Sequence, residues 1–296
     1  MSSVSFPVVP NGVVLLGEVV CWKVPTGTVI RHADMVAALQ GAGLDASAAR
    51  VLCKRHAFVR ACRELSADRI VRRLHEDNGL VTFQFTAEVL DAGQFRYDFE
   101  ATVSMDKATG AVTGSDPALA QRVETELNAC EEDRTVTDIT RVVNVLFRRH
   151  ADLFPIREQG GAYFVPQAHA AFIGQVEQFL AALGGRLARF PIPDGTPQGN
   201  TSVSTAVADG LTDILAEYEA SIAVIDCNTR DSTLDRAFQL VQAAAAKVHF
   251  YRQYLGSHAA RLEDHVAWLG KMLRDRKEEA EAQKLVEGAL ADVMAS

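Results

Sequence analysis

Two adjacent segments decide the fold, Thr137-Asp-Ile-Thr-Arg-Val-Val-Asn-Val-Leu-Phe-Arg-Arg-His-Ala-Asp-Leu153 and Phe154-Pro-Ile-Arg-Glu-Gln-Gly-Gly-Ala-Tyr-Phe-Val-Pro166. In the first segment the residues of one face recur at three- and four-residue steps, at Ile139, Val142, Val143, Leu146, Phe147, His150 and Leu153. This spacing predicts a helix, in which Thr137 can cap the start and Asp138 suits the positive end of the helix dipole. Because Pro155 cannot continue a helix, the chain changes form there.

The second segment predicts a β-hairpin. Gly160-Gly161 permits the positive φ angles of a tight turn, and Tyr163-Phe-Val165 favours a strand. Pro166 stops that strand and suits the first turn of the next helix. The whole stretch from Pro117 to Leu183 is therefore predicted to form a helix, a turn, a second helix, a hairpin and a third helix, in that order. This is the order in which a winged-helix unit presents a recognition helix and its wing.

A similar order of elements occurs nearer the N-terminus, over residues 31–105. Helices are predicted from Val29 to Leu39, from an Asp45 cap to about Leu65, and from about Ala67 to His75. The first two have the spacing of a helix-turn-helix. The two copies share the order of their elements and no residue-level repeat.

A long β-hairpin is predicted after these helices. Its apolar residues alternate strictly with polar ones and are Val81, Phe83, Phe85, Ala87, Val89, Phe95, Tyr97, Phe99, Ala101, Val103 and Met105. Such alternation predicts that these side chains share one buried face of the hairpin, while the polar side chains face solvent.

The C-terminal part has a different character. Residues 191–205 contain many Gly, Pro, Asn, Ser and Thr and predict a linker. Residues 206–296 then carry three apolar stripes at helical spacing, which predict an antiparallel helical bundle or coiled coil. The expected fold is α+β and mainly helical, with an N-terminal unit over 1–115 and a winged-helix-like unit over 116–190.

The bulk properties indicate a globular protein of a reducing compartment. The chain has 296 residues, of which 48% are hydrophobic, and a formal net charge of −8. Its five cysteines are scattered without a Cys-x-x-Cys pair, which disfavours a disulfide framework or a zinc site. No signal peptide and no membrane span is expected, because the most apolar run, Val13–Trp22, is short and contains Glu18. We expect a cytoplasmic location.

Positive charge is concentrated between Ala46 and Glu76, where eight basic residues face three acidic ones. On a helix-turn-helix-like segment, such a concentration suits contacts with phosphates. The candidates for these contacts are Arg50, Lys54, Arg55 and Arg60. The alternative is a solvated helix face whose arginines pair with carboxylates elsewhere in the chain.

A second candidate surface lies on the helix at 137–153, opposite its apolar stripe. Arg141, Asn144 and Arg148 share this face, and Arg157 lies in the predicted wing. Arginine and asparagine are the residue types that read guanine and adenine edges. An ordinary exposed helix face also carries such residues, so this alternative stays open.

Nothing in the sequence favours an enzyme. No phosphate-binding loop, dinucleotide glycine pattern or nucleophile elbow is present, and no cofactor or metal is expected. A cysteine–histidine nucleophile pair would need no particular spacing in the sequence, and no residue pattern selects one.

The segments Gly160-Gly-Ala-Tyr-Phe-Val-Pro166 and Phe190-Pro-Ile-Pro-Asp194 resemble an uncharacterised family of bacterial and phage proteins. The resemblance covers roughly residues 12 to 220. It implies a Gly-Gly hairpin, a helical C-terminal part and a bacterial or phage context. It implies no activity and no site residues.

Two functions are consistent with these observations. The first is a non-enzymatic nucleic-acid-binding or regulatory protein that contacts double-stranded nucleic acid through winged-helix-like units. The second is a structural or assembly subunit, that is, a protein–protein scaffold of a bacterial or phage complex. In both, residues 206–296, with 10 basic and 15 acidic residues, are expected to form a homo-oligomer or to bind a partner protein.

Overall fold

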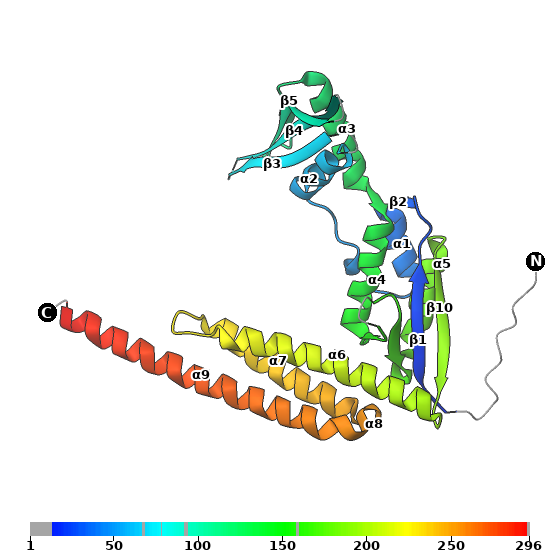
Figure 1. The fold of residues 1–296 in the computed structure, drawn as a ribbon, viewed down its shortest axis with the longest axis vertical. Helices are drawn as coiled ribbons and strands as arrows, with labels where there is room; N and C mark the ends of the chain where they lie inside the picture. The colour runs from blue at the N-terminus through cyan, green and yellow to red at the C-terminus, as the bar shows by residue number, and fades with distance from the viewer. Residues whose placement is uncertain (1–13, 67–68, 78, 92–93, 158–159, 295–296) are drawn as a thin grey trace, which may run out of the picture. The chain divides into compact units, whose positions relative to one another are not determined.

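A computed structural model describes residues 14–66, 69–77, 79–91, 94–157 and 160–294. The fold is mixed α+β and mainly helical, as the sequence predicts (Figure 1). The chain divides into two compact units. The first unit contains Met1–Trp22, His150–Ile173 and Leu187–Ser296, and the second contains Lys23–Arg149 and Gly174–Arg186.

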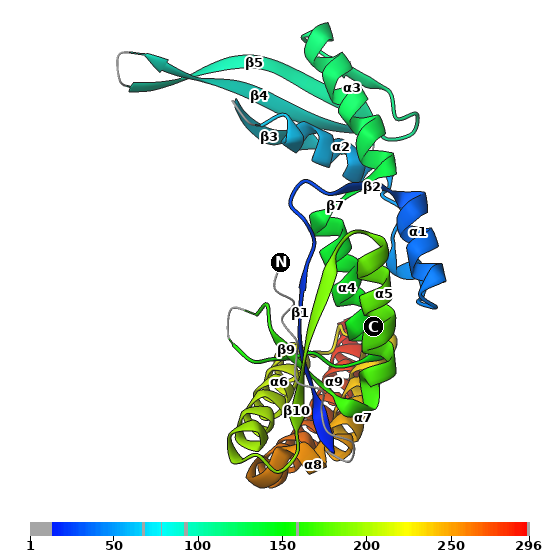
Figure 2. The same ribbon diagram turned by 90° about the vertical axis from the view of Figure 1, so that its right-hand side faces the viewer.

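An antiparallel sheet with two helices on one face forms one part of the second unit. The strands lie in the order β3 (Arg69–Glu76), β4 (Leu80–Asp91), β5 (Gln94–Asp106), β6 (Val112–Gly114). The helices are α2 (Lys54–Glu64) and α3 (Pro117–Glu132). Their core contains Phe58, Phe83, Phe85 and Val103, all buried. The β4–β5 hairpin extends past both helices (Figure 2).

The other part of the second unit is built around a short ladder. Strand β2 (Val29–Arg31) pairs antiparallel with β7 (Asp133–Thr135). Around this ladder lie α1 (His32–Gly41), the 3₁₀ turn η1 (Ala46–Ala48) and α4 (Val136–His150). The predicted apolar stripe of α4 is confirmed at Ile139, Val142, Val143, Leu146 and Phe147, which are buried. Its predicted end is wrong, because His150 is exposed and Leu153 lies beyond the last residue of the helix.

A second sheet belongs mainly to the first unit. Its order is β10 (Arg186–Pro193), β1 (Leu15–Lys23), β9 (Tyr163–Pro166), β8 (Phe154–Pro155). The predicted Gly-Gly hairpin is confirmed as the antiparallel β8–β9 pair, and Gly160 and Gly161 have φ angles of 66° and 86°. After β9 come the turn η2 (Gln167–His169) and α5 (Ala170–Ala182).

Three long helices and two short helical segments make up the rest of the described part of the first unit. They are α6 (Pro197–Ala223), α7 (Asp231–Phe250), the short α8 (Arg252–Leu255) and η3 (Gly256–His258), and α9 (Ala259–Met294). Helices α6, α7 and α9 share one core, which includes Leu211, Leu215, Val248, Leu262 and Leu269. Phe154 and Phe164 of the hairpin are buried in the same core. No helix in the described ranges is long and apolar enough to cross a membrane.

Three predicted elements differ from the structure. Residues 69–76 form β3 rather than a third helix, because pairing with β4 outweighs their local pattern; residues 67–68 lie outside the described residues. The helix expected from Asp45 is two elements, because Asp45 caps only η1 and α2 begins at Lys54. The linker expected over 191–205 holds the end of β10 and the first turns of α6, whose Pro197 occupies the first helical turn.

The β4–β5 hairpin contains a β-bulge that sequence alternation does not reveal. Phe85 pairs with Ala101, but the next residue, Thr86, pairs with Phe99, so Glu100 is the extra residue on β5. One extra residue moves the following side chains to the opposite face. Phe95, Tyr97 and Phe99 are therefore exposed rather than buried, with 62%, 55% and 62% of their surface accessible. Their predicted place on the buried face is wrong.

Candidate functional site

A groove of about 620 Å³ lies in the second unit, along the polar face of α4. Met35 of α1 and Ala48 of η1 also line it, as does the segment that leads into α2. Its polar wall contains five arginines and one asparagine, namely Arg50, Arg134, Arg141, Asn144, Arg148 and Arg149. We call this set the arginine groove. The one carboxylate among the groove's described lining residues is Asp138.

Three of these arginines are available to a ligand. Arg50, Arg141 and Arg148 are exposed and make no hydrogen bond or ion pair with any other described residue. Arg149 is engaged, since its Nη1 lies 2.6 Å from Asp45 Oδ2 and 2.8 Å from Ser47 Oγ. The free guanidinium groups on this face thus have no competing carboxylate of their own.

Arg134 differs from the others because it is buried, with 3% of its surface accessible. Its Nη1 donates to the backbone carbonyls of Cys130, Glu131 and Asp133 at the end of α3, at 2.8–3.3 Å. Its Nη2 has no hydrogen-bond partner among the described residues. Burial lowers the pKa of the Arg134 guanidinium, which still remains charged at neutral pH. A buried cation without a paired carboxylate favours an anion in the groove that it lines.

Asp138 is already neutralised. Arg60 Nη1 lies 2.7 Å from Asp138 Oδ2, and the backbone amide of Thr135 donates to the same oxygen at 2.8 Å. Burial opposes ionisation of Asp138, but these hydrogen bonds and the Arg60 charge lower its pKa overall. The predicted contact residue Arg60 is therefore held by Asp138 of α4, and its Nη2 also donates to Thr135 Oγ1 of β7 at 3.0 Å.

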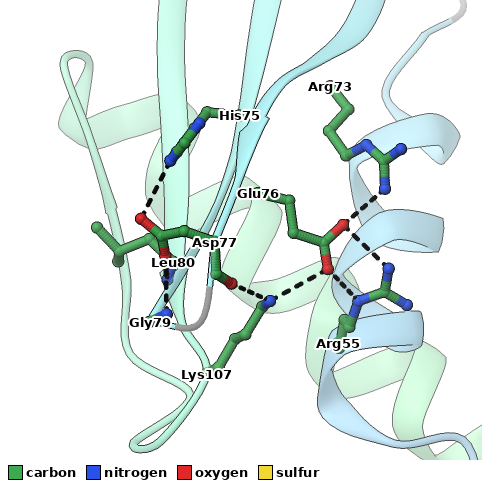
Figure 3. Close-up of polar contacts among 8 residues, drawn as sticks. All are labelled: Arg55, Arg73, His75, Glu76, Asp77, Gly79, Leu80 and Lys107. Carbon is green, nitrogen blue, oxygen red and sulfur yellow. Dashed lines mark hydrogen bonds and ion pairs between the residues drawn. The ribbon is translucent and has the colours of Figure 1, made fainter. Parts of the chain in front are cut away.

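The basic residues of α2 and β3 are also partly neutralised, by a cluster around Glu76 (Figure 3). Arg55 approaches Glu76 through two bonds, of 2.5 and 3.0 Å. Arg73 Nη1 and Lys107 Nζ lie 2.6 and 3.1 Å from the same carboxylate. Hydrogen bonds from Arg55 and Lys107 lower the pKa of Glu76 to about 2. Arg55, predicted to contact phosphate, thus has its charge satisfied within the chain.

Because of this cluster, we expect the stability of the folded chain to fall as the pH becomes acidic. Because the pKa of Glu76 is about 2 in the folded chain, below its ordinary value, its contribution is full above about pH 4.5 and is lost as the pH falls toward 2. We expect Glu76→Gln to lower the thermal midpoint at pH 6, with the gap to wild type narrowing by pH 3. Circular dichroism melts check this. Glu88→Gln is the matched control, at an exposed carboxylate that has no ion pair with any described residue, and a gap of constant size would contradict the prediction.

The remaining predicted residues lie outside the groove. Lys54 is the exposed first residue of α2, and no described residue forms an ion pair with it. Arg157 belongs to the first unit, where its Nε donates to the carbonyl of Gly160 in its own hairpin. This hydrogen bond stabilises the Gly-Gly turn, so Arg157 has a structural role that requires no ligand.

Four of the eight predicted residues, Arg50, Arg141, Asn144 and Arg148, thus line one groove. Two residues of the site, Arg134 and Arg149, are not among the residues that the sequence pattern predicts. Arg134 follows the acidic run Glu131-Glu-Asp133, so the local net charge is negative and the segment does not stand out as basic. Its place after the end of a helix was the available signal, since basic side chains there bond the last carbonyls.

The chain belongs to the family of unknown function DUF6744, whose family model matches residues 15–284. No curated protein and no solved structure matches the chain.

Proposed function

We propose that this protein binds double-stranded nucleic acid without enzymatic chemistry, through the arginine groove. The observation that carries the proposal is the co-location of Arg50, Arg141 and Arg148, all without an ion pair among the described residues, with the buried Arg134. Guanidinium groups bind phosphates well, often with two parallel hydrogen bonds, and a row of them matches the repeated charges of a phosphate backbone.

The helices beside the groove support a helix-turn-helix-like arrangement. Helices α3 and α4 are joined by three residues, the length typical of a helix-turn-helix. In this arrangement α4 is the recognition helix, and Asn144 lies between two arginines on its polar face. Arginines then contact the phosphates, and Asn144 is placed to read a base edge. We propose that the protein works in a bacterial or phage context, where it regulates or packages nucleic acid.

The direct test is fluorescence anisotropy of a labelled 20–30 base-pair duplex of mixed sequence with the full chain, at rising salt. We expect log affinity to fall linearly with log salt concentration between about 50 and about 200 mM, as counterion release requires. Absence of binding at the lowest salt concentration would overturn the proposal.

A structural or assembly role is the second candidate. It is favoured by apolar side chains that α9 leaves exposed, namely Trp268, Leu285 and Val286. In this role a partner protein or a second copy covers α9, as expected for residues 206–296. Because α6–α9 also form the core that buries Phe154 and Phe164, deleting them would unfold the first unit.

Point substitutions on α9 therefore test this role better than a deletion. We expect Leu285→Glu with Val286→Glu to lower the molar mass measured by light scattering, since these exposed side chains would be buried by association. An unchanged molar mass would count against an interface at this end of α9. Circular dichroism establishes that the variant is folded.

A further inference from the structure

The outer half of the β4–β5 hairpin has an open edge. On the side of β5 away from β4, β6 pairs only with Val103, Ser104 and Met105. Among the described residues, no strand pairs with this side of β5 over Phe95–Phe99 (Figure 2). An unpaired strand edge presents a row of free backbone donors and acceptors, which another strand can use.

The open edge also carries an exposed aromatic row. The bulge at Glu100 places Phe95, Tyr97 and Phe99 on the solvent face of the sheet, where they pair with Leu90, Glu88 and Thr86 of β4. Exposed aromatic rows of this kind mark interaction sites on soluble proteins. A bare two-stranded ribbon is also only marginally stable in water. Both features indicate that this part of the hairpin acquires a partner.

The charge of the hairpin narrows the choice of partner. Residues 80–106 contain five acidic residues and one basic residue, Arg96. Single-stranded nucleic acid also stacks on aromatic rows, but it requires a positively charged groove around them. An acidic hairpin repels a phosphate backbone, so the fitting partner is a protein strand.

The sequence of the edge is complementary to itself. In Phe95-Arg-Tyr-Asp-Phe99 the residue types are symmetric about Tyr97, with opposite charges on either side. If two copies pair antiparallel across a two-fold axis at Tyr97, Phe95 lies opposite Phe99 of the second copy. Arg96 then lies opposite Asp98 of the second copy. Aromatic pairs and opposite charges directly across an antiparallel ladder are both stabilising.

We propose that the protein forms a two-fold homodimer in which the β5 strands of two copies pair edge to edge, centred on Tyr97. Such an interface is isologous, so each copy supplies the same patch. Within one chain, Arg96 Nη2 already lies 2.7 Å from Asp98 Oδ2. The two side chains are 62% and 46% exposed, so they can exchange this contact for the one across the interface. The dimer does not depend on the arginine groove.

Two opposite charge changes test this register. Arg96→Asp places two acidic pairs across the axis, and Asp98→Arg places two basic pairs, so each variant alone repels its own copy. We expect each to weaken dimerisation about tenfold or more in sedimentation velocity. An equimolar mixture restores opposite charges at both positions, and we expect it to form a heterodimer with affinity close to that of wild type.

The matched control is Arg72→Asp, which changes the charge of an exposed arginine on β3, away from the β5 edge, and should dimerise like wild type. Circular dichroism confirms that each variant is folded. The proposal is overturned if wild type is monomeric up to about 200 μM, well above a micromolar dissociation constant. It is equally overturned if both single variants dimerise like wild type, or if their mixture associates no better than either alone.

Discussion

Replacing Arg50, Arg141 and Arg148 together with alanine is expected to lower duplex affinity by about a hundredfold or more at about 100 mM salt. Each of these side chains lines the arginine groove and is free of internal ion pairs among the described residues. Each lost phosphate contact also reduces the slope of log affinity against log salt by about one, so we expect a reduction of about three. Anisotropy titrations at four or more salt concentrations measure both quantities.

The control for this experiment removes the same charge elsewhere in the second unit. Lys54, Arg63 and Arg72 are exposed, without an ion pair to a described residue, and outside the groove. Their triple replacement by alanine should leave the affinity within a few fold of wild type. If both triple variants lose affinity equally, binding is diffuse and the groove is not the site. If neither does, the duplex binds elsewhere or not at all.

Helix periodicity is why part of this site could be predicted. Arg141, Asn144 and Arg148 are neighbours on α4 because of its 3.6-residue repeat, which depends only on local sequence. Arg50 joins them through the tertiary fold, so its spacing in the sequence carried no such signal. The same tertiary contacts pair Arg55 with Glu76 and Arg60 with Asp138. A segment that reads as a uniform basic patch is therefore divided into satisfied and free charges.

In the β4–β5 hairpin, the sequence did not predict which face of the sheet carries the outer side chains. Alternation predicted both strands correctly, and the inner half of the hairpin obeys it, with Phe83 and Val103 buried as cross-strand partners. The extra residue Glu100 leaves no mark in the alternation, because apolar residues continue at every second position on both sides of it. Only the pairing register shows that the outer aromatic residues lie on the other face.

The Gly-Gly hairpin was expected to be the wing of a winged-helix unit, but its aromatic side chains are buried in a helical core. Phe154 has 1% of its surface accessible, and its ring meets that of Tyr251 edge to face, with centroids 5.1 Å apart. A Cβ atom at Gly210 of α6 would lie 2.8 Å from the Phe154 ring, so the helix needs a glycine there. Phe164 of β9 makes a similar edge contact with Tyr254. The hairpin thus joins the sheet to the helical core of the first unit.

Phe154→Ala is therefore expected to destabilise the first unit by about 3–5 kcal/mol, the usual cost of removing a buried phenylalanine ring. Urea unfolding followed by tryptophan fluorescence measures this selectively, because both tryptophans of the chain, Trp22 and Trp268, belong to the first unit. The matched control is Ile156→Ala on the same hairpin, whose side chain is 40% exposed and should cost well under half as much. A loss below about 1 kcal/mol for Phe154→Ala would mean that the hairpin is not anchored in the core and is free to act as a wing.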